Sequence, residues 1–138
     1  MIGIDTNVLV AICVLEHEHH AKVKNWVSSV GDPLSTTLVN TSEFLRLLTH
    51  PRVFPKPLKF RDACNMLDEL INAYDLRVFS SSFNWWQNGL EKIPSGVGGN
   101  SIFDFQIAYT FFENGVKRIS TFDNGFKRYS FIKSFEPA

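Results

Sequence analysis

The stretch MIGIDTNVLVAICVL, residues 1–15, decides the fold of this chain of 138 residues. It opens with four apolar residues and then a carboxylate, Asp5, which is the pattern of a short buried strand that ends at a polar residue. Thr6 or Asn7 could cap the helix that follows, because short polar side chains accept hydrogen bonds from the free N–H groups at a helix start. The apolar residues after Asn7 are spaced as in a helix, so the stretch predicts a strand joined directly to a helix.

Strands and helices alternate along the rest of the sequence. Besides the first strand, the pattern predicts strands at residues 34–37, 76–80, 116–121 and 131–135. It predicts helices at residues 8–15, 21–30, 43–48, 61–74 and 102–114, and a short one around residues 85 and 86. Asn40, Thr41 or Ser42 could cap the third of these helices. Such alternation is typical of an α/β domain built on a parallel sheet, and we expect one domain over residues 1–138.

The composition suits a small folded domain and excludes several other classes. Hydrophobic residues make up 44% of the chain and aromatic residues 14%, so there is enough apolar material for one core. No apolar run approaches the roughly 20 residues needed to span a bilayer, and VLVAICVL has neither a basic leader nor a small-residue cleavage site. Cys13 and Cys64 have no CxxC spacing, which favours free thiols in a reducing compartment over a disulfide. We therefore expect a cytoplasmic protein that does not contact a membrane.

Basic residues are clustered although the net charge is zero. Residues 46–61 contain five basic residues and no acidic one, and residues 115–134 contain five basic residues and only Asp123. Ten of the fourteen Lys and Arg residues thus lie in two segments. A solvated face is the ordinary explanation of such runs, but a locally basic surface on a neutral protein is compatible with nucleic-acid binding. The charge pattern permits a nucleic-acid partner without requiring one.

Four of the fourteen acidic residues interrupt apolar segments. They are Asp5, Glu43, Asp104 and Asp123. Three of them are expected at the end of a strand or the start of a helix, and in an open α/β sheet these positions converge on the crevice at the carboxyl ends of the strands. Burying an ionised carboxylate is costly unless it is paired or bound to a metal. No matching buried Lys or Arg is expected beside these acids, so the pattern favours a bound cation.

Hard oxygen ligands of this kind select Mg²⁺ or Mn²⁺. Mg²⁺ usually keeps several waters and takes one or two carboxylates directly, so the other acids would act through water. Such a site can activate a water molecule and stabilise the charge of an in-line phosphoryl displacement. Any one of the acids could instead cap a helix or pair with a neighbour. Such ordinary roles do not explain why four acids interrupt apolar segments. The residues alone therefore indicate metal-assisted phosphoryl chemistry at the edge of an α/β sheet.

Four motifs, in this order and at this spacing, resemble those of a known family. They are MIGIDTNVLV at residues 1–10, STTLVNTSEFLRLL at 35–48, GGNSIFDFQIAYTFFENGV at 98–116 and RISTFDNGFKRY at 118–129. The chain resembles the PIN-domain ribonucleases, and in particular the VapC-type toxins of bacterial and archaeal toxin–antitoxin systems. The resemblance runs nearly from end to end. It implies a PIN-like three-layer α/β/α domain with a central, mostly parallel sheet of four to five strands.

The resemblance also implies roles for the acids and for two polar residues. Asp5 and Asp104 would be direct metal ligands. Glu43 and Asp123 would complete the metal shell or orient the attacking water. Thr121 and Asn7, which match polar supports of the family, would hold carboxylates or water by hydrogen bonds.

The sequence departs from the family pattern at two positions. The family often carries a second acidic residue two positions after its last Asp, where this chain has Gly125. It also often has His or a small polar residue before its third Asp, where this chain has Phe103. The first departure removes a fifth acidic ligand, and the second is expected to alter substrate contacts without removing a member of the acidic quartet.

The function implied is that of a Mg²⁺- or Mn²⁺-dependent endoribonuclease acting as a toxin. Its partners would be an RNA substrate, with transfer RNA as one candidate, and a cognate antitoxin protein. A homodimer is expected, and operator DNA would be bound only through the antitoxin.

Two other functions stay open at this point. An Asp at the end of the first strand also suggests an aspartate-based phosphatase or phosphoacceptor domain, although DTN lacks the second Asp expected two residues after such a nucleophile. A catalytically idle module that only forms a complex with an antitoxin and operator DNA is the other, although the intact set of acids argues against idleness.

Two further groups of side chains invite functional interpretations. His17, His19 and His20 lie in a charged turn and are expected to be solvated rather than to bind a metal. Trp85 and Trp86 could stack on bases, but at least one of them is expected to pack in the core.

Overall fold

The computed structural model describes all 138 residues, and the predicted elements are present with small shifts of their ends. The strands are β1 (Ile2–Ile4), β2 (Leu34–Thr37), β3 (Arg77–Phe79), β4 (Arg118–Ser120) and β5 (Lys133–Phe135). The α-helices are α1 (Thr6–Cys13), α2 (His20–Ser29), α3 (Leu38–Thr49), α4 (Phe60–Ala73), α5 (Trp85–Asn88) and α6 (Ser101–Glu113). Two 3-10 helices are also present, η1 (Leu90–Lys92) and η2 (Asn124–Arg128). None of the helices has the length and apolar character needed to cross a membrane.

All five strands form one parallel sheet in the order β3–β2–β1–β4–β5. β1 lies at its centre, with Gly3 opposite Ser35 of β2 on one side and Ile119 of β4 on the other. Parallel neighbours need long crossover connections, which the intervening helices supply. The predicted α/β domain with a mostly parallel sheet of four to five strands is confirmed.

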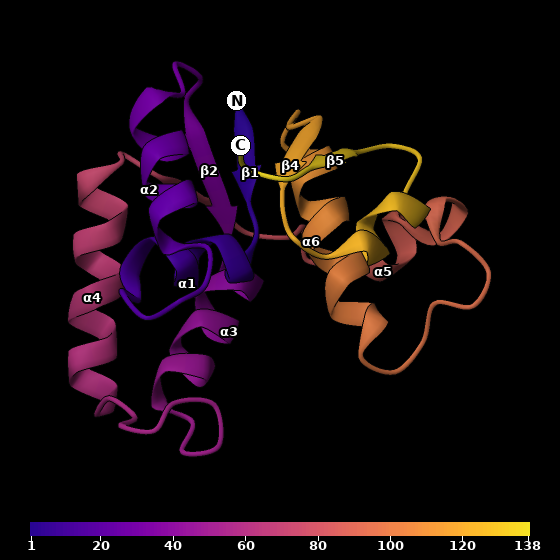
Figure 1. The fold of residues 1–138 in the computed structure, drawn as a ribbon. Coiled ribbons are helices and arrows are strands. Elements are labelled where there is room, and N and C mark those ends of the chain that lie inside the picture. The colour runs from indigo at the N-terminus through magenta and orange to yellow at the C-terminus, as the bar shows by residue number, and fades with distance from the viewer.

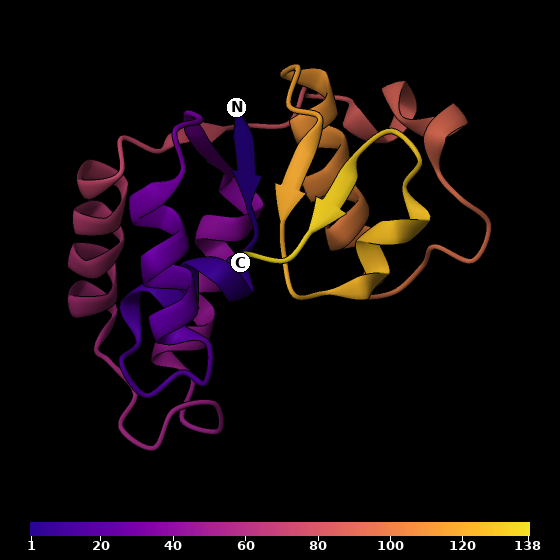
Figure 2. The same ribbon diagram turned by 45° about the horizontal axis from the view of Figure 1, so that its top comes forward.

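The sheet separates two layers of helices, as Figures 1 and 2 show. Helices α1 to α4 enclose one hydrophobic core, which includes Ile2 and Ile4 of β1. Helix α6 encloses the other core, which includes Phe111. Side chains alternate between the two faces of a strand, so Gly3 faces α6, where a Cβ atom would lie only 2.6 Å from Cζ of Phe111. The predicted three-layer α/β/α arrangement is confirmed, and a glycine at the centre of β1 lets α6 approach the sheet closely.

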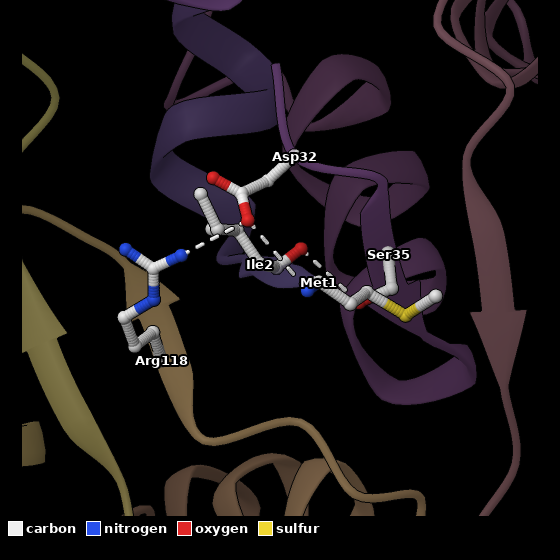
Figure 3. A network of polar contacts seen from close by, with 5 residues as sticks. All are labelled: Met1, Ile2, Asp32, Ser35 and Arg118. Carbon is white, nitrogen blue, oxygen red and sulfur yellow. Dashed lines mark hydrogen bonds and ion pairs between the residues drawn. The ribbon is translucent and has the colours of Figure 1, made fainter. Parts of the chain in front are cut away.

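A polar network fastens the amino edge of the sheet (Figure 3). The Asp32 carboxylate lies 3.1 Å from the Arg118 guanidinium at the start of β4 and 3.9 Å from the amino group of Met1. The hydroxyl of Ser35 donates a hydrogen bond of 3.1 Å to the carbonyl of Ile2. These contacts join β1, β2 and β4 where the strands begin. Asp5 and Asp123 lie at the opposite edge, where the strands end.

Two helices are capped by residues other than those predicted. The Asp5 carboxylate accepts a hydrogen bond from the N–H of Thr6, so Asp5, and not one of the two residues after it, caps α1. The hydroxyl oxygen of Thr37 accepts from the N–H of Asn40 and caps α3, so the predicted cap within residues 40–42 is wrong. In both cases the last residue before the helix has an extended backbone, which is the conformation that a cap requires.

Candidate active site

The four predicted carboxylates come from the carboxyl edge of the sheet and from the helices that begin there. Asp5 directly follows β1, and Asp123 lies three residues after the end of β4. Because β1 and β4 are parallel neighbours, their ends lie at the same edge. Glu43 lies in the second turn of α3 and Asp104 in the first turn of α6, and these two helices are in contact. The fold thus directs acids from four separate segments to one region.

Asp5 is the most buried of the four acids, with 5% of its surface exposed. Its Oδ1 accepts hydrogen bonds from the N–H of Thr6 at 2.8 Å and from Nδ2 of Asn40 at 3.1 Å. Its Oδ2 accepts from the hydroxyl of Thr121 at 2.5 Å. Burial raises the pKa of Asp5 from its usual 3.8 to about 7, although the hydrogen bonds from Thr121 and Thr6 lower it. The carboxylate is therefore held in a fixed orientation and is costly to ionise in the absence of a cation.

Asn40 and Thr6 connect Asp5 to Glu43, and neither was predicted as a site residue. Nδ2 of Asn40 also donates to the hydroxyl of Thr6 at 3.0 Å, and that hydroxyl donates to Oε2 of Glu43 at 3.2 Å. Thr37, the cap of α3, donates to Oδ1 of Asn40 at 2.7 Å and fixes the direction of its amide. In the sequence Asn40 stood out only as a short polar residue near the start of a helix, which fitted a helix cap equally well.

Thr121 and Asn7 form hydrogen bonds around Asp5 and the segment that carries Asp123. The hydroxyl of Thr121 accepts hydrogen bonds from the N–H of Asp123 at 3.0 Å and from Nδ2 of Asn7 at 3.5 Å, while it donates to Asp5. Oδ1 of Asn7 accepts from the N–H of Phe122 at 3.3 Å. Asp123 itself is exposed, and its Oδ1 caps η2 by accepting from the N–H of Gly125 at 2.7 Å. These contacts fix the segment after β4 against the start of α1.

The carboxylates repel one another, and no basic side chain forms an ion pair with them. Burial and repulsion from Asp104 raise the pKa of Glu43, against a hydrogen bond from Thr6 that lowers it. Burial and repulsion from Asp123 raise the pKa of Asp104. Asp5 in turn is repelled by Glu43 and Asp104. All ion pairs of the chain lie elsewhere, on Asp32 and on Glu18. Arg46 and Arg128 offset the raised pKa values of Glu43 and Asp104 only in part, so the site keeps an excess of negative charge that a cation would stabilise.

The donor set fits a hydrated divalent cation better than a fully protein-ligated one. No three His, Cys, Asp or Glu side chains of the chain are close enough to ligate one ion together. Mg²⁺ keeps several waters and needs only one or two carboxylates directly, so such an arrangement suits it, whereas a structural zinc site would need four close ligands. Asp5 and Asp104 could hold the ion directly, with Glu43 and Asp123 acting through its waters.

Cation binding at this site is expected to release protons and to weaken as the pH falls. The pKa of Asp5 is about 7, so at pH 6 most of this carboxyl is protonated and the proton must leave before a cation can bind. We expect the Mg²⁺ affinity to fall below pH 7 by up to about tenfold per pH unit. Isothermal titration calorimetry at pH 6 and pH 8, in buffers of different ionisation enthalpy, would count the protons released. An affinity independent of pH over this range would contradict the expectation.

The histidine turn lies closer to the site than its charged sequence indicated. The ring of His19 stacks on that of Phe122, the residue between Thr121 and Asp123, with 4.3 Å between centroids. Nδ1 of His20 lies 2.8 Å from the carbonyl oxygen of Ala11. His19 lies in the predicted turn with 36% of its side chain exposed, whereas His20 departs from the prediction because it is the first residue of α2. As predicted, one of the tryptophans packs inward, because Trp85 contacts the fully buried Phe105.

The chain matches the model of the PIN domain over residues 2–132. It belongs to the PIN-domain family. Among curated proteins, this PIN domain is similar to ribonuclease VapC38 of Mycobacterium tuberculosis, with 27% identity over 123 residues that cover 88% of this chain and 84% of that protein. The resemblance noted in the sequence is therefore confirmed.

Solved structures of the same fold cover nearly the whole PIN domain. The crystal structure of VapC20 from Mycobacterium tuberculosis, described as a toxin that cleaves the sarcin–ricin loop, matches with a TM-score of 0.73 and 17% identity, covering 96% of this chain and 98% of that one. VapBC2 from Rickettsia felis, bound to a DNA fragment from its promoter, matches with a TM-score of 0.64 and 16% identity, covering 99% and 98% of the two chains. At these identities the structures establish the shared fold.

Proposed function

We propose that this PIN-domain protein is a metal-dependent endoribonuclease that acts as the toxin of a toxin–antitoxin pair, with residues 1–138 as one domain. The observation that carries the proposal is the cluster of carboxylates without an ion pair at the carboxyl edge of the sheet, with Asp5 buried and Glu43 and Asp104 half-buried, in which burial and mutual repulsion raise the pKa of these three acids. A site of this kind suits a cation and a phosphodiester rather than a neutral substrate. The similarity to VapC ribonucleases supports RNA as the substrate.

The proposed ion is Mg²⁺ or Mn²⁺, held directly by Asp5 and Asp104. When bound, it would supply charge stabilisation and a more acidic water for hydrolysis of a phosphodiester bond. Asp5 is oriented for this by hydrogen bonds to both of its carboxylate oxygens.

Glu43 and Asp123 are each held through one oxygen and keep the other available. Oε2 of Glu43 accepts from Thr6, and Oδ1 of Asp123 accepts from Gly125, which leaves Oε1 and Oδ2 without a protein partner. We assign these two oxygens to orienting the attacking water and the waters around the ion. Burial raises the pKa of Glu43, which suits it to accept the water's proton.

The proposed partners follow from the similar proteins. An antitoxin protein is proposed because structures of the same fold include VapBC complexes, one of them on promoter DNA. Operator DNA would be bound only through that antitoxin. A homodimer, a transfer RNA target and a cytoplasmic site of action are parts of the same proposal.

Replacing Asp104 by Asn tests the activity directly. We expect RNA cleavage in the presence of Mg²⁺ to fall by at least about 100-fold, because a neutral amide is a much poorer metal ligand than a carboxylate. Gel analysis of cleaved RNA would measure the loss, with Asp68→Asn on the exposed face of α4 as the matched control. Full cleavage by Asp104→Asn would exclude this mechanism.

The alternative of an aspartyl-phosphate enzyme, with Asp5 as its nucleophile, is less well supported by the residues present. The position two residues later is Asn7, which cannot serve as the acid of such an enzyme.

A further inference from the structure

A groove of about 660 Å³ lies beside the carboxylates, between α3 and α6. Glu43 and Asp104 lie in its wall. Most of its other lining residues are polar and come from the same two helices and the turn before α6. The groove therefore borders the proposed reaction centre, and its volume lies in the range of pockets that bind small ligands.

Arg46 places a free guanidinium group in this groove. It lies three residues after Glu43 on α3, which is the spacing that puts two side chains on one face of a helix. It is close enough to Glu43 to lower the pKa of that carboxyl, yet it forms no ion pair. A guanidinium that is solvated and unpaired is well suited to bind a phosphate through two parallel hydrogen bonds.

Phe103 places an exposed ring on the other wall. It directly precedes Asp104 in the first turn of α6, and 53% of its surface is exposed. It takes no part in the stacked and edge-on ring contacts that join Phe105, Tyr109, Tyr129 and Phe131 on the same side of the sheet. The ring is therefore not required to fill the core. An exposed aromatic face beside a phosphate-binding group is the arrangement by which proteins hold single-stranded nucleic acid.

We propose that this groove is a nucleotide subsite, in which Arg46 binds a phosphate next to the cleaved one and Phe103 stacks on the adjoining base. The proposal rests on the ribonuclease function proposed above and assigns two residues of this chain that position the RNA. A base can lie on Phe103 only when it has left its own helical stack. Stacking tolerates every base, so the subsite contributes affinity and register with little base preference.

Cleavage kinetics on a short single-stranded RNA with Mg²⁺ would test both residues. Phe103→Ala is expected to raise KM by about tenfold, in the range that base stacking contributes, while Phe103→Trp keeps a stacking face and retains the wild-type KM. Arg46→Ala is expected to reduce the slope of log(kcat/KM) against log salt by about 0.7, which is the change for one lost phosphate contact on a single strand. Arg46→Lys keeps the charge and should keep most of that slope.

The same RNA with one base removed tests the stacking contact from the substrate's side. In the proposed subsite, the base of the nucleotide next to the cleaved bond lies on Phe103. Removing that base should raise the KM of the wild type by about tenfold. It should add nothing further to the KM of Phe103→Ala, because the two changes remove the same contact.

Matched controls lie outside the groove. Phe83, of which 91% is exposed, and Arg77, which is exposed at the start of β3, are not among its lining residues. Phe83→Ala and Arg77→Ala should leave KM and the salt slope unchanged. If the wild type cleaves RNA but Phe103→Ala and Arg46→Ala have the same KM and salt slope as the controls, the subsite is overturned and the nuclease function stands. The groove would then be assigned to a protein partner. No cleavage by the wild type with Mg²⁺ or Mn²⁺ would overturn the nuclease function and the subsite with it.

Discussion

Replacing Asp5 by Asn is expected to abolish RNA cleavage and, in metal-free protein, to increase stability. Activity should fall on the order of 1000-fold or more, because the proposed ion loses the carboxylate that the structure holds most firmly. The fold should survive, since Asn has the same shape and its oxygen can still accept from Asn40 and from the N–H of Thr6. A variant that is inactive and yet more stable would show that stability has been given up for function at this position.

The gain in stability should depend on pH in a defined direction. The pKa of Asp5 is about 7 in the folded protein and near its usual 3.8 in the unfolded chain, so the folded state binds this proton more tightly. The stability that protonated Asp5 contributes is complete below pH 3.8 and is lost as the pH rises through 7. Asn is neutral throughout and avoids that loss. The advantage of Asp5→Asn should therefore grow from pH 4 to pH 7 and level off above.

Denaturant unfolding in EDTA at pH 5 and pH 8 would measure this advantage. The proton linkage alone corresponds to about 4 kcal/mol at pH 8. A weaker hydrogen bond to Thr121 should reduce the gain to about 1–3 kcal/mol. Asp68→Asn on α4 is the control and should change little at either pH. Equal stability changes at pH 5 and pH 8 would mean that ionised Asp5 carries no penalty in the fold.

Adding a side chain at Gly3 is expected to destabilise the protein severely. A Cβ atom there would lie 2.6 Å from Cζ of Phe111, and Phe111 is fully buried with no room to move. We expect Gly3→Ala to cost about 3 kcal/mol and Gly3→Val to prevent folding, because overpacking forces the backbone or the ring out of place. Gly31→Ala is the control, since nothing lies within 4 Å of the added atom.

A second substitution separates this steric conflict from a general intolerance of β1. In Phe111→Leu the ring is absent, so Gly3→Ala should cost less in that background than in the wild type, with a coupling of about 1–3 kcal/mol. Thermal unfolding of the four proteins would give this coupling. Strictly additive effects would mean that α6 does not limit the side chain at Gly3.

The local pattern predicted the elements, whereas contacts between distant segments decided the details of the site. Apolar spacing located the strands and helices within a few residues, and the interruption of apolar segments located the acids. The role of Asn40 depends on Asp5, which lies 35 residues earlier in the chain, and no local pattern records that pairing. The groove could not be foreseen because it exists only where α3 and α6 meet. The stack of His19 on Phe122 could not be foreseen either, because it joins two residues that are far apart in the sequence.

The central place of β1 in the sheet has a consequence for the order of events on the ribosome. β1 is made first, but one of its two neighbours, β4, ends at Ser120, and the hydroxyl that holds Asp5 belongs to Thr121. Until this region has left the ribosome, β1 lacks β4 as its neighbour in the sheet. Asp5 then also lacks the hydrogen bond from Thr121 that helps to orient it. The site proposed for RNA cleavage is therefore assembled only after Thr121 and Asp123 have left the ribosome.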